Sequence, residues 1–172
     1  QFFHPNILFL PTKDPKLNLK EIRKLMDTAL NNGSGLILYD KDHDIDLGSE
    51  EQINVWISNR VLDGDFYSPR YYDLAMLIAY RLYKNWHGRI RIWMPIKRTQ
   101  EEQARAFMDR LIYEARLPQD TEYELIKKKF DPAFVEAPQG DIHLVAIDSF
   151  EELKEVKRLN KKTDKSCLLI MD

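Results

Sequence analysis

The sequence predicts an α/β domain with a mostly parallel sheet and helices on both of its faces. Short apolar runs alternate with helical periodicities along the whole chain, which is the pattern of such a fold. The runs Asn6–Leu10 and Ile142–Ile147 are continuously apolar, as expected for strands that are buried on both faces. A length of 172 residues suits one domain with its own core and is too short for two ordinary ones. We therefore expect residues 1–172 to form a single α/β domain.

Each predicted element follows from its own local pattern. Asn18 with Glu21 forms an N-cap pairing before the first helical stripe, and Asn32-Gly33 ends that helix. Thr99 with Glu102 forms a capping box before another helix, whereas the prolines 132 and 138 indicate an irregular loop. The predicted strands are 6–10, 35–39, 53–57, 89–94, 122–126, 142–147 and 167–171, and the predicted helices are 18–30, 71–86, 100–117 and 149–160.

Composition excludes several classes of partner and location. With 26 Lys and Arg against 28 Asp and Glu, the net charge is −2, which disfavours both nucleic acid and direct lipid binding. Cys167 is the only cysteine, so no intrachain disulfide, zinc or redox pair forms, and reducing cytosol fits best. The apolar run from residue 71 to residue 86 is interrupted by charges and does not span a bilayer. The start at Gln1 and the end just after an apolar run suggest a piece of a longer protein.

Nucleotide binding lacks its usual glycine motifs. No G-x-G-x-x-G or G-x-x-x-x-G-K-[ST] motif is present, and no glycine lies between Arg89 and Gln139, so a close phosphate cradle is not expected there. Lys97 and Arg98 follow a strand and could attract an anion, although a solvated basic loop is the favoured interpretation. The run Lys127-Lys128-Lys129 is likewise interpreted as a solvated strand end. No cofactor is predicted.

One loop has part of the spacing of a calcium site. Its carboxylates alternate and end on Glu51, as in an EF-hand loop, but Ile45 stands where the sharp turn needs glycine. A solvated acidic loop is therefore favoured, His43 within it is interpreted as an exposed histidine, and no metal is predicted. The alternating carboxylates are Asp40, Asp42, Asp44 and Asp46.

Catalytic residues are not predicted, and we expect the protein not to be an enzyme. No G-x-S-x-G nucleophile motif is present, and the serines fall at turns, caps and strand edges. His143 lies in an apolar strand and is interpreted as a core histidine rather than a general base. Cys167 opens an apolar run and is interpreted as a core thiol.

The helix predicted over residues 71–86 is apolar around about two thirds of its circumference. A helix that covers one sheet face needs an apolar stripe of only a little over 100°. The excess predicts either a second helix of this domain on the other side or an interface with another subdomain or protomer, and both alternatives remain open. The candidate interface residues are Tyr71, Tyr72, Tyr80, Tyr83 and Trp86.

Several ordered segments resemble the cytosolic C-terminal domain of the cation-chloride cotransporters. The family pattern includes R-P-N-[VI]-L, I-D-V-W-W, D-G-G, an apolar helix that ends near a tryptophan, and a strand of the type [KR]-[IM]-R-[IV]-F. The corresponding segments here are His4-Pro5-Asn6-Ile7-Leu8, Ile53-Asn54-Val55-Trp56-Ile57, Asp63-Gly64-Asp65, 74–86 and Arg89-Ile90-Arg91-Ile92-Trp93. Their order and spacing agree with the family over most of residues 3–126.

The departures from the pattern suggest a distant, prokaryotic member. His4 replaces arginine, Asn54 replaces aspartate, Ile57 replaces the second tryptophan and Asp65 replaces the second glycine. The resemblance implies two subdomains that are similar to universal stress proteins, of which this chain is the second. It also implies a position on the cytoplasmic side of the cell membrane, with the chain's own transmembrane domain and upstream cytosolic subdomain as partners.

Two functional hypotheses follow, with a third behind them. The first is a non-catalytic regulatory and dimerisation domain of a cation-chloride cotransporter-like secondary transporter, which forms a homodimer. The alternative is a universal-stress-protein-like domain that senses nucleotides, with Asp14 and Lys97-Arg98 at strand ends. The third is a calcium-responsive module that uses the acidic loop from Asp40 to Glu51.

Overall fold

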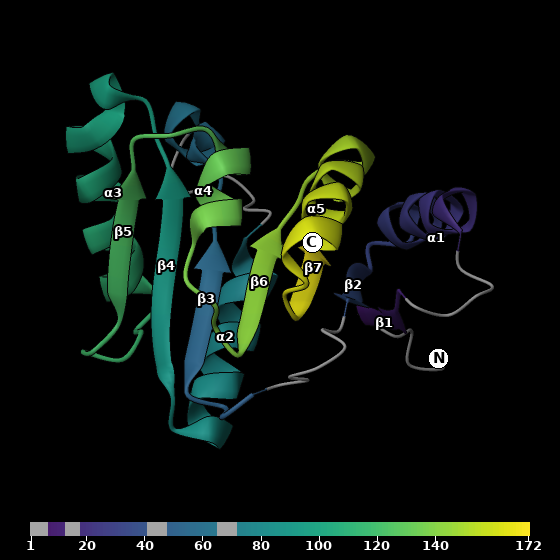
Figure 1. Cartoon of the computed structure of the whole chain (residues 1–172), viewed down its shortest axis with the longest axis horizontal. Helices are drawn as coiled ribbons and strands as arrows, with labels where there is room; N and C mark the ends of the chain where they lie inside the picture. The colour runs from purple at the N-terminus through teal and green to yellow at the C-terminus, as the bar shows by residue number, and fades with distance from the viewer. Residues whose placement is uncertain (1–6, 13–17, 41–47, 65–71) are drawn as a thin grey trace.

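The computed structural model describes residues 7–12, 18–40, 48–64 and 72–172, and their strands form one seven-stranded sheet (Figure 1). The order of strands across the sheet is β1-β2-β7-β6-β3-β4-β5. The predicted α/β fold with a mostly parallel sheet is therefore confirmed. The strands are β1 Ile7–Pro11, β2 Gly35–Asp40, β3 Gln52–Trp56, β4 Arg89–Pro95, β5 Glu122–Ile126, β6 Ile142–Ala146 and β7 Cys167–Met171.

Strands β3 to β7 run parallel to one another, while β1 and β2 run in the opposite direction. The junction is the antiparallel pairing of β2 with β7, in which Leu36 lies opposite Met171 and Asp40 lies opposite Cys167. This direction places the end of β2 at the same edge of the sheet as the start of β3, so the connection between them needs no crossover helix. In Figure 1, β1, β2 and α1 (Leu19–Asn31) form the end of the sheet beside β7.

Helices cover both faces of the sheet, as the sequence predicts. Helices α2 (Asp73–Trp86) and α3 (Glu101–Glu114) pack on one face, with Ala75 and Met108 fully buried beneath them. Helix α1 packs on the other face, together with α4 (Phe130–Glu136) and α5 (Phe150–Thr163). In β3 the side chains alternate between the two cores, since Val55 packs toward α2 and Trp56 packs toward α4.

The structure corrects the prediction of an irregular loop at residues 132–138. Helix α4 occupies part of this segment, and Pro132 is its third residue. Proline is tolerated there because the amide groups of the first turn have no partner within the helix. A short 3-10 helix, η1 (Asn59–Asp63), and another, η2 (Arg98–Gln100), were also not predicted.

A buried polar layer joins β3 to its two neighbours on the α4 side. The indole N–H of Trp56 donates to Nδ1 of His143 on β6 at 3.1 Å, and the indole N–H of Trp93 on β4 donates to Asn54 at 2.8 Å. Nε2 of His143 is buried and makes no hydrogen bond to the part of the chain that the structure describes. His143 and Asn54 therefore each accept the hydrogen bond of a buried indole N–H. This confirms the interpretation of His143 as a core histidine.

Asp141 fastens the start of β6 to the start of β3. Its carboxylate accepts the backbone N–H groups of Ser49, Glu51 and Gln52 at 2.7–2.8 Å. Burial opposes ionisation of Asp141, but these hydrogen bonds outweigh it and lower its pKa.

Within the described ranges, no helix is long and apolar enough to cross a membrane.

We predict that His143 makes stability fall as the pH drops below about 6.5. Burial, reinforced by the charge of Lys165, lowers the pKa of His143 to about 3, so the unfolded chain binds a proton that the folded state rejects. The free energy of unfolding should therefore fall by up to about 1.4 kcal/mol per pH unit from this group. His143→Gln keeps an acceptor for Trp56 and should flatten this part of the profile in urea unfolding between pH 7.5 and 4.5. An identical profile for the variant would contradict the prediction.

Candidate ligand cavity at the carboxyl edge of the sheet

The strand order creates a crevice beside β3. From β3 the chain proceeds to β4 and β5 on one side, and it returns to β6 and β7 on the other. The segments that follow β3 and β6 therefore diverge at the carboxyl ends of these strands, and such a switch point is where parallel α/β sheets bind ligands. A cavity of about 540 Å³ lies there. It is lined by Trp56, Ile57, Ser58, Asn59, Pro95, Ile96, Lys97, Arg98, Lys127, Lys128, Lys129, Phe130, Asp131, Val145, Ala146, Ile147, Glu152, Glu155 and Val156.

The inner surface of the cavity is aromatic and aliphatic. Trp56 stacks on Trp93 with ring centroids 5.5 Å apart and planes 16° apart, and its indole meets Phe130 edge to face at 5.6 Å. Ile147, which follows β6, and Val156 on α5 complete the apolar wall. A planar apolar group of a ligand fits this surface.

Lysine 165 holds α4, and with it Phe130, against the cavity. Its side chain is 2% exposed, and Nζ donates to the backbone oxygens of Phe134 at 2.7 Å and Ala137 at 2.9 Å. These oxygens lie at the end of α4, where carbonyl groups lack partners within the helix. Burial lowers the pKa of Lys165. The contact therefore orients a short helix that bears part of the cavity lining.

The carboxylates that line the cavity are already neutralised by arginines. Arg158 binds Glu155 at 2.5 Å and Asp131 at 3.0 Å, and Arg60 binds Glu152. The side-chain hydrogen bond from Arg158 is the main reason that the pKa of Glu155 falls to about 2.

The cations of the cavity are only partly neutralised. Lys127 pairs with Glu101 at 2.6 Å and Lys128 pairs with Glu136. Lys97, Arg98 and Lys129 form no ion pair with any residue in the ranges that the structure describes. The cavity therefore has an excess of positive charge and is suited to an anionic ligand.

The predicted basic residues come together here, and they are exposed to solvent, as the sequence interpretation expects. Lys97 and Arg98 line the cavity from the β4 side, and Lys127-Lys128-Lys129 line it from the β5 side. The sequence placed each group at a strand end but could not show that two neighbouring strands bring both to one cavity. Sequence reasoning missed Arg60, Glu152 and Arg158. Arg60 and Glu152 pair with each other across 92 positions of the chain, and Arg158 lies on a helix that carries no recognisable functional motif.

The other candidate residues that the structure describes do not line the cavity. Of the acidic loop, residues 41–47 and His43 lie outside the described residues, as does Asp14. Asp40 accepts hydrogen bonds from Thr12 at 2.8 Å and Asn160 at 2.9 Å. No cluster of three or more His, Cys, Asp or Glu side chains that could hold a metal occurs within the described ranges. Cys167 is buried in the core, as predicted, and burial raises its pKa.

The candidate interface residues of α2 occupy three different environments. Tyr72 is 1% exposed and meets Phe107 edge to face at 5.9 Å, so it belongs to the core. Tyr80 is exposed and stacks on the partly exposed Tyr83 at 6.4 Å, and Trp86 packs against the core while staying partly exposed. Tyr71 lies outside the described residues.

Leu77, which the sequence did not single out, is 53% exposed on the same helix. The open apolar face of α2 is therefore formed by Leu77 and Tyr80, with Tyr83 beside them; we call these three residues the α2 face.

Comparison with known proteins decides the family. The family model described as "Prokaryotic cation-chloride cotransporter, C-terminal domain, 2nd" matches residues 48–172. The chain belongs to this family. The matched range begins just before β3 and includes the five parallel strands and the whole cavity. The first strands, β1 and β2, lie outside it.

A solved structure agrees with the family. The crystal structure of the cytoplasmic domain of a prokaryotic cation chloride cotransporter superposes with a TM-score of 0.83 and 27% sequence identity. The match covers 100% of this chain and 66% of that chain, so this chain spans about two thirds of that domain's length. No curated protein matches the sequence. This member of the prokaryotic cation-chloride cotransporter family is thus part of a transporter's cytoplasmic domain.

Proposed function

We propose that this cotransporter domain is a non-catalytic regulatory and dimerisation module that acts through the α2 face. The observation that carries the proposal is the exposure of Leu77 at 53% on a helix whose opposite side is fully buried. Large apolar side chains grouped with tyrosines are typical of the centre of protein interfaces. Two copies of α2 that meet across a two-fold axis would cover these side chains reciprocally.

We further propose that the chain is the second half of the cytoplasmic domain and that its first strand faces the upstream subdomain. Strand β1 lies at the edge of the sheet, and two of its large apolar side chains are exposed, Phe9 at 55% and Ile7 at 41%. An apolar edge strand is protected when another element covers it. The remaining third of the related solved domain is consistent with such a neighbour. The transmembrane domain would carry ion transport.

We predict that the isolated domain self-associates through the α2 face. Light scattering or sedimentation across micromolar concentrations should show a dimer, and Leu77→Glu with Tyr80→Ser should weaken its affinity by about a hundredfold, because two central contacts are lost. Tyr113→Ser is the matched control, since Tyr113 is 83% exposed on a different helix, α3. A strictly monomeric wild type, both alone and joined to its upstream subdomain, would refute the dimerisation proposal.

The cavity favours a second candidate function, which is nucleotide sensing. An adenine ring matches the apolar surface of Trp56 and Phe130. The phosphates match Lys97, Arg98 and Lys129, for which the described part of the chain supplies no ion-pair partner. This site lacks a glycine-rich cradle, because the segment between β4 and β6 contains no glycine up to Gly140. Phosphates would therefore be held by side chains, and binding should be strongly dependent on salt.

We predict that ATP stabilises the domain thermally. A ligand at a hundred times its Kd raises the free energy of unfolding by about 2.7 kcal/mol, which for a domain of this size is roughly 5–10 °C in Tm. Lys97→Gln with Arg98→Gln should remove most of this shift, whereas Lys24→Gln on α1 should not change it. No shift for the wild type at millimolar ATP would eliminate nucleotide sensing and leave the dimerisation module.

A further inference from the structure

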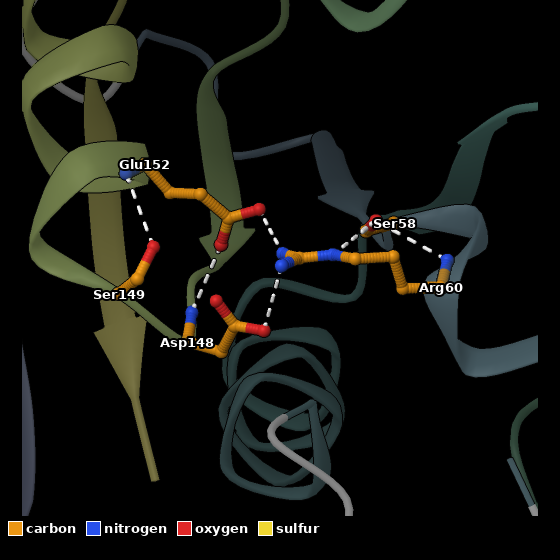
Figure 2. A network of polar contacts seen from close by, with 5 residues as sticks. All are labelled: Ser58, Arg60, Asp148, Ser149 and Glu152. Carbon is orange, nitrogen blue, oxygen red and sulfur yellow. Dashed lines mark hydrogen bonds and ion pairs between the residues drawn. The ribbon is translucent and has the colours of Figure 1, made fainter. Parts of the chain in front are cut away.

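Arg60 joins the two segments that diverge at the switch point. It lies in η1, just beyond the end of β3, and its Nη1 binds Asp148 Oδ2 at 3.0 Å. Its Nη2 binds the carboxylate of Glu152, in the first turn of α5. Figure 2 shows the guanidinium between these two carboxylates. We call these three residues the Arg60 clasp.

The two carboxylates of the clasp are held close together independently of Arg60. The backbone N–H of Asp148 donates to Glu152 Oε2 at 3.0 Å, and Ser149 accepts the N–H of Glu152 at 3.3 Å (Figure 2). Burial, together with the nearby charge of Asp148, raises the pKa of Glu152. Two neighbouring carboxylates of which one is partly buried need a cation, and Arg60 supplies it.

The ion pair is nevertheless easily replaced. The side chain of Arg60 is 47% exposed, and those of Asp148 and Glu152 are 36% and 31% exposed. Exposed ion pairs contribute little to stability because water and salt screen them. A more highly charged anion can therefore compete with the two carboxylates for the guanidinium.

The clasp also forms part of the wall of the ligand cavity. Glu152 lines the cavity, as do Ser58 and Asn59, which precede Arg60 in the chain. The hydroxyl of Ser58 accepts hydrogen bonds from the backbone N–H and Nε of Arg60, both at 3.3 Å. Arg60 itself does not line the cavity, but its guanidinium is bound to Glu152, which does. The planar fork of the guanidinium suits phosphate oxygens better than a lysine would.

We propose that Arg60 exchanges Asp148 and Glu152 for the phosphate groups of an anionic ligand bound in the cavity. The inference rests on the proposed nucleotide-sensing function and adds its structural response. When the exchange occurs, η1 is released from α5 but stays fixed to η2 and α3. Asn59 donates to Gln100 of η2 at 2.8 Å, and Gln103 of α3 donates to the backbone oxygen of Leu62 at 2.6 Å. Because η1 leads along the chain to α2, ligand binding changes the constraint on the helix that bears the α2 face.

The decisive test is a charge-matched double variant titrated with ATP by calorimetry. Arg60→Gln with Glu152→Gln removes one positive and one negative charge, so the net charge of the clasp stays the same. If Arg60 binds the phosphates, this variant loses that contact, and its Kd should rise about tenfold. Glu152→Gln alone leaves Arg60 with Asp148 as its one carboxylate partner in the clasp and should lower the Kd. Arg60→Lys, which keeps the charge but loses the fork, should fall between the wild type and the double variant.

Controls separate the exchange from a loss of folding. Arg110→Gln with Glu114→Gln removes an exposed ion pair of the same type on α3, at 2.8 Å, and should leave the Kd unchanged. Thermal melting of every variant shows whether it is folded. A double variant that is folded and binds ATP as tightly as the wild type would overturn the exchange and leave nucleotide sensing intact. ATP binding to neither the wild type nor Glu152→Gln would overturn both.

Discussion

The parallel pairing of β3 with β6 is the constraint on which the rest of the structure depends. These strands are neighbours in the sheet, although 85 residues of chain separate the end of β3 at Trp56 from the start of β6 at Ile142, and β4 and β5 form within them. Separate interactions hold the pair at three levels. Asp141 binds backbone N–H groups at the amino ends, His143 accepts the indole N–H of Trp56 in the core, and Arg60 binds Asp148 at the carboxyl ends.

The three levels differ in strength in a way that suits their positions. His143 lies in the core, where loss of its contact leaves a buried polar group without a partner. Asp141 is less buried, but its carboxylate accepts three backbone N–H groups at once. The side chains of the Arg60 clasp are partly exposed, so breaking their ion pairs leaves charged groups that water can solvate. The ion pairs at the carboxyl ends, where the cavity lies, are therefore the contacts that an anion can most easily replace. Binding proteins commonly combine a rigid scaffold with adaptable loops in this way.

The fold was largely predictable because local patterns determine it. Each of the seven strands was predicted within about a residue, since continuous apolar runs bounded by proline, glycine or charge have few other interpretations. The reverse direction of β1 and β2 was not predicted, because an apolar run does not specify the orientation of its neighbour. Helix α4 was missed because Pro132 was treated as a breaker, although it occupies the first turn.

The cavity was only partly predictable, since its residues meet through topology. Lys97 and Arg98 were identified as strand-end cations, but their proximity to Phe130 and Glu152 depends on β3 lying between β4 and β6. Arg60 and Asp148 are 88 positions apart and belong to no motif. Tyr72 looked like its neighbours on an apolar helix, yet its place at the start of α2 directs it into the core against Phe107. The sequence indicated too many aromatic groups for one face but not which of them are exposed.

The central claim is that a ligand in the cavity acts on the segment around Arg60, and amide hydrogen exchange with and without saturating ATP tests it most directly. The exchange mechanism predicts altered rates in η1 (residues 59–63) and in the first turn of α5, and unchanged rates in α1, which lies at the far end of the sheet. Rates that ATP leaves unchanged in both η1 and α5 would contradict it.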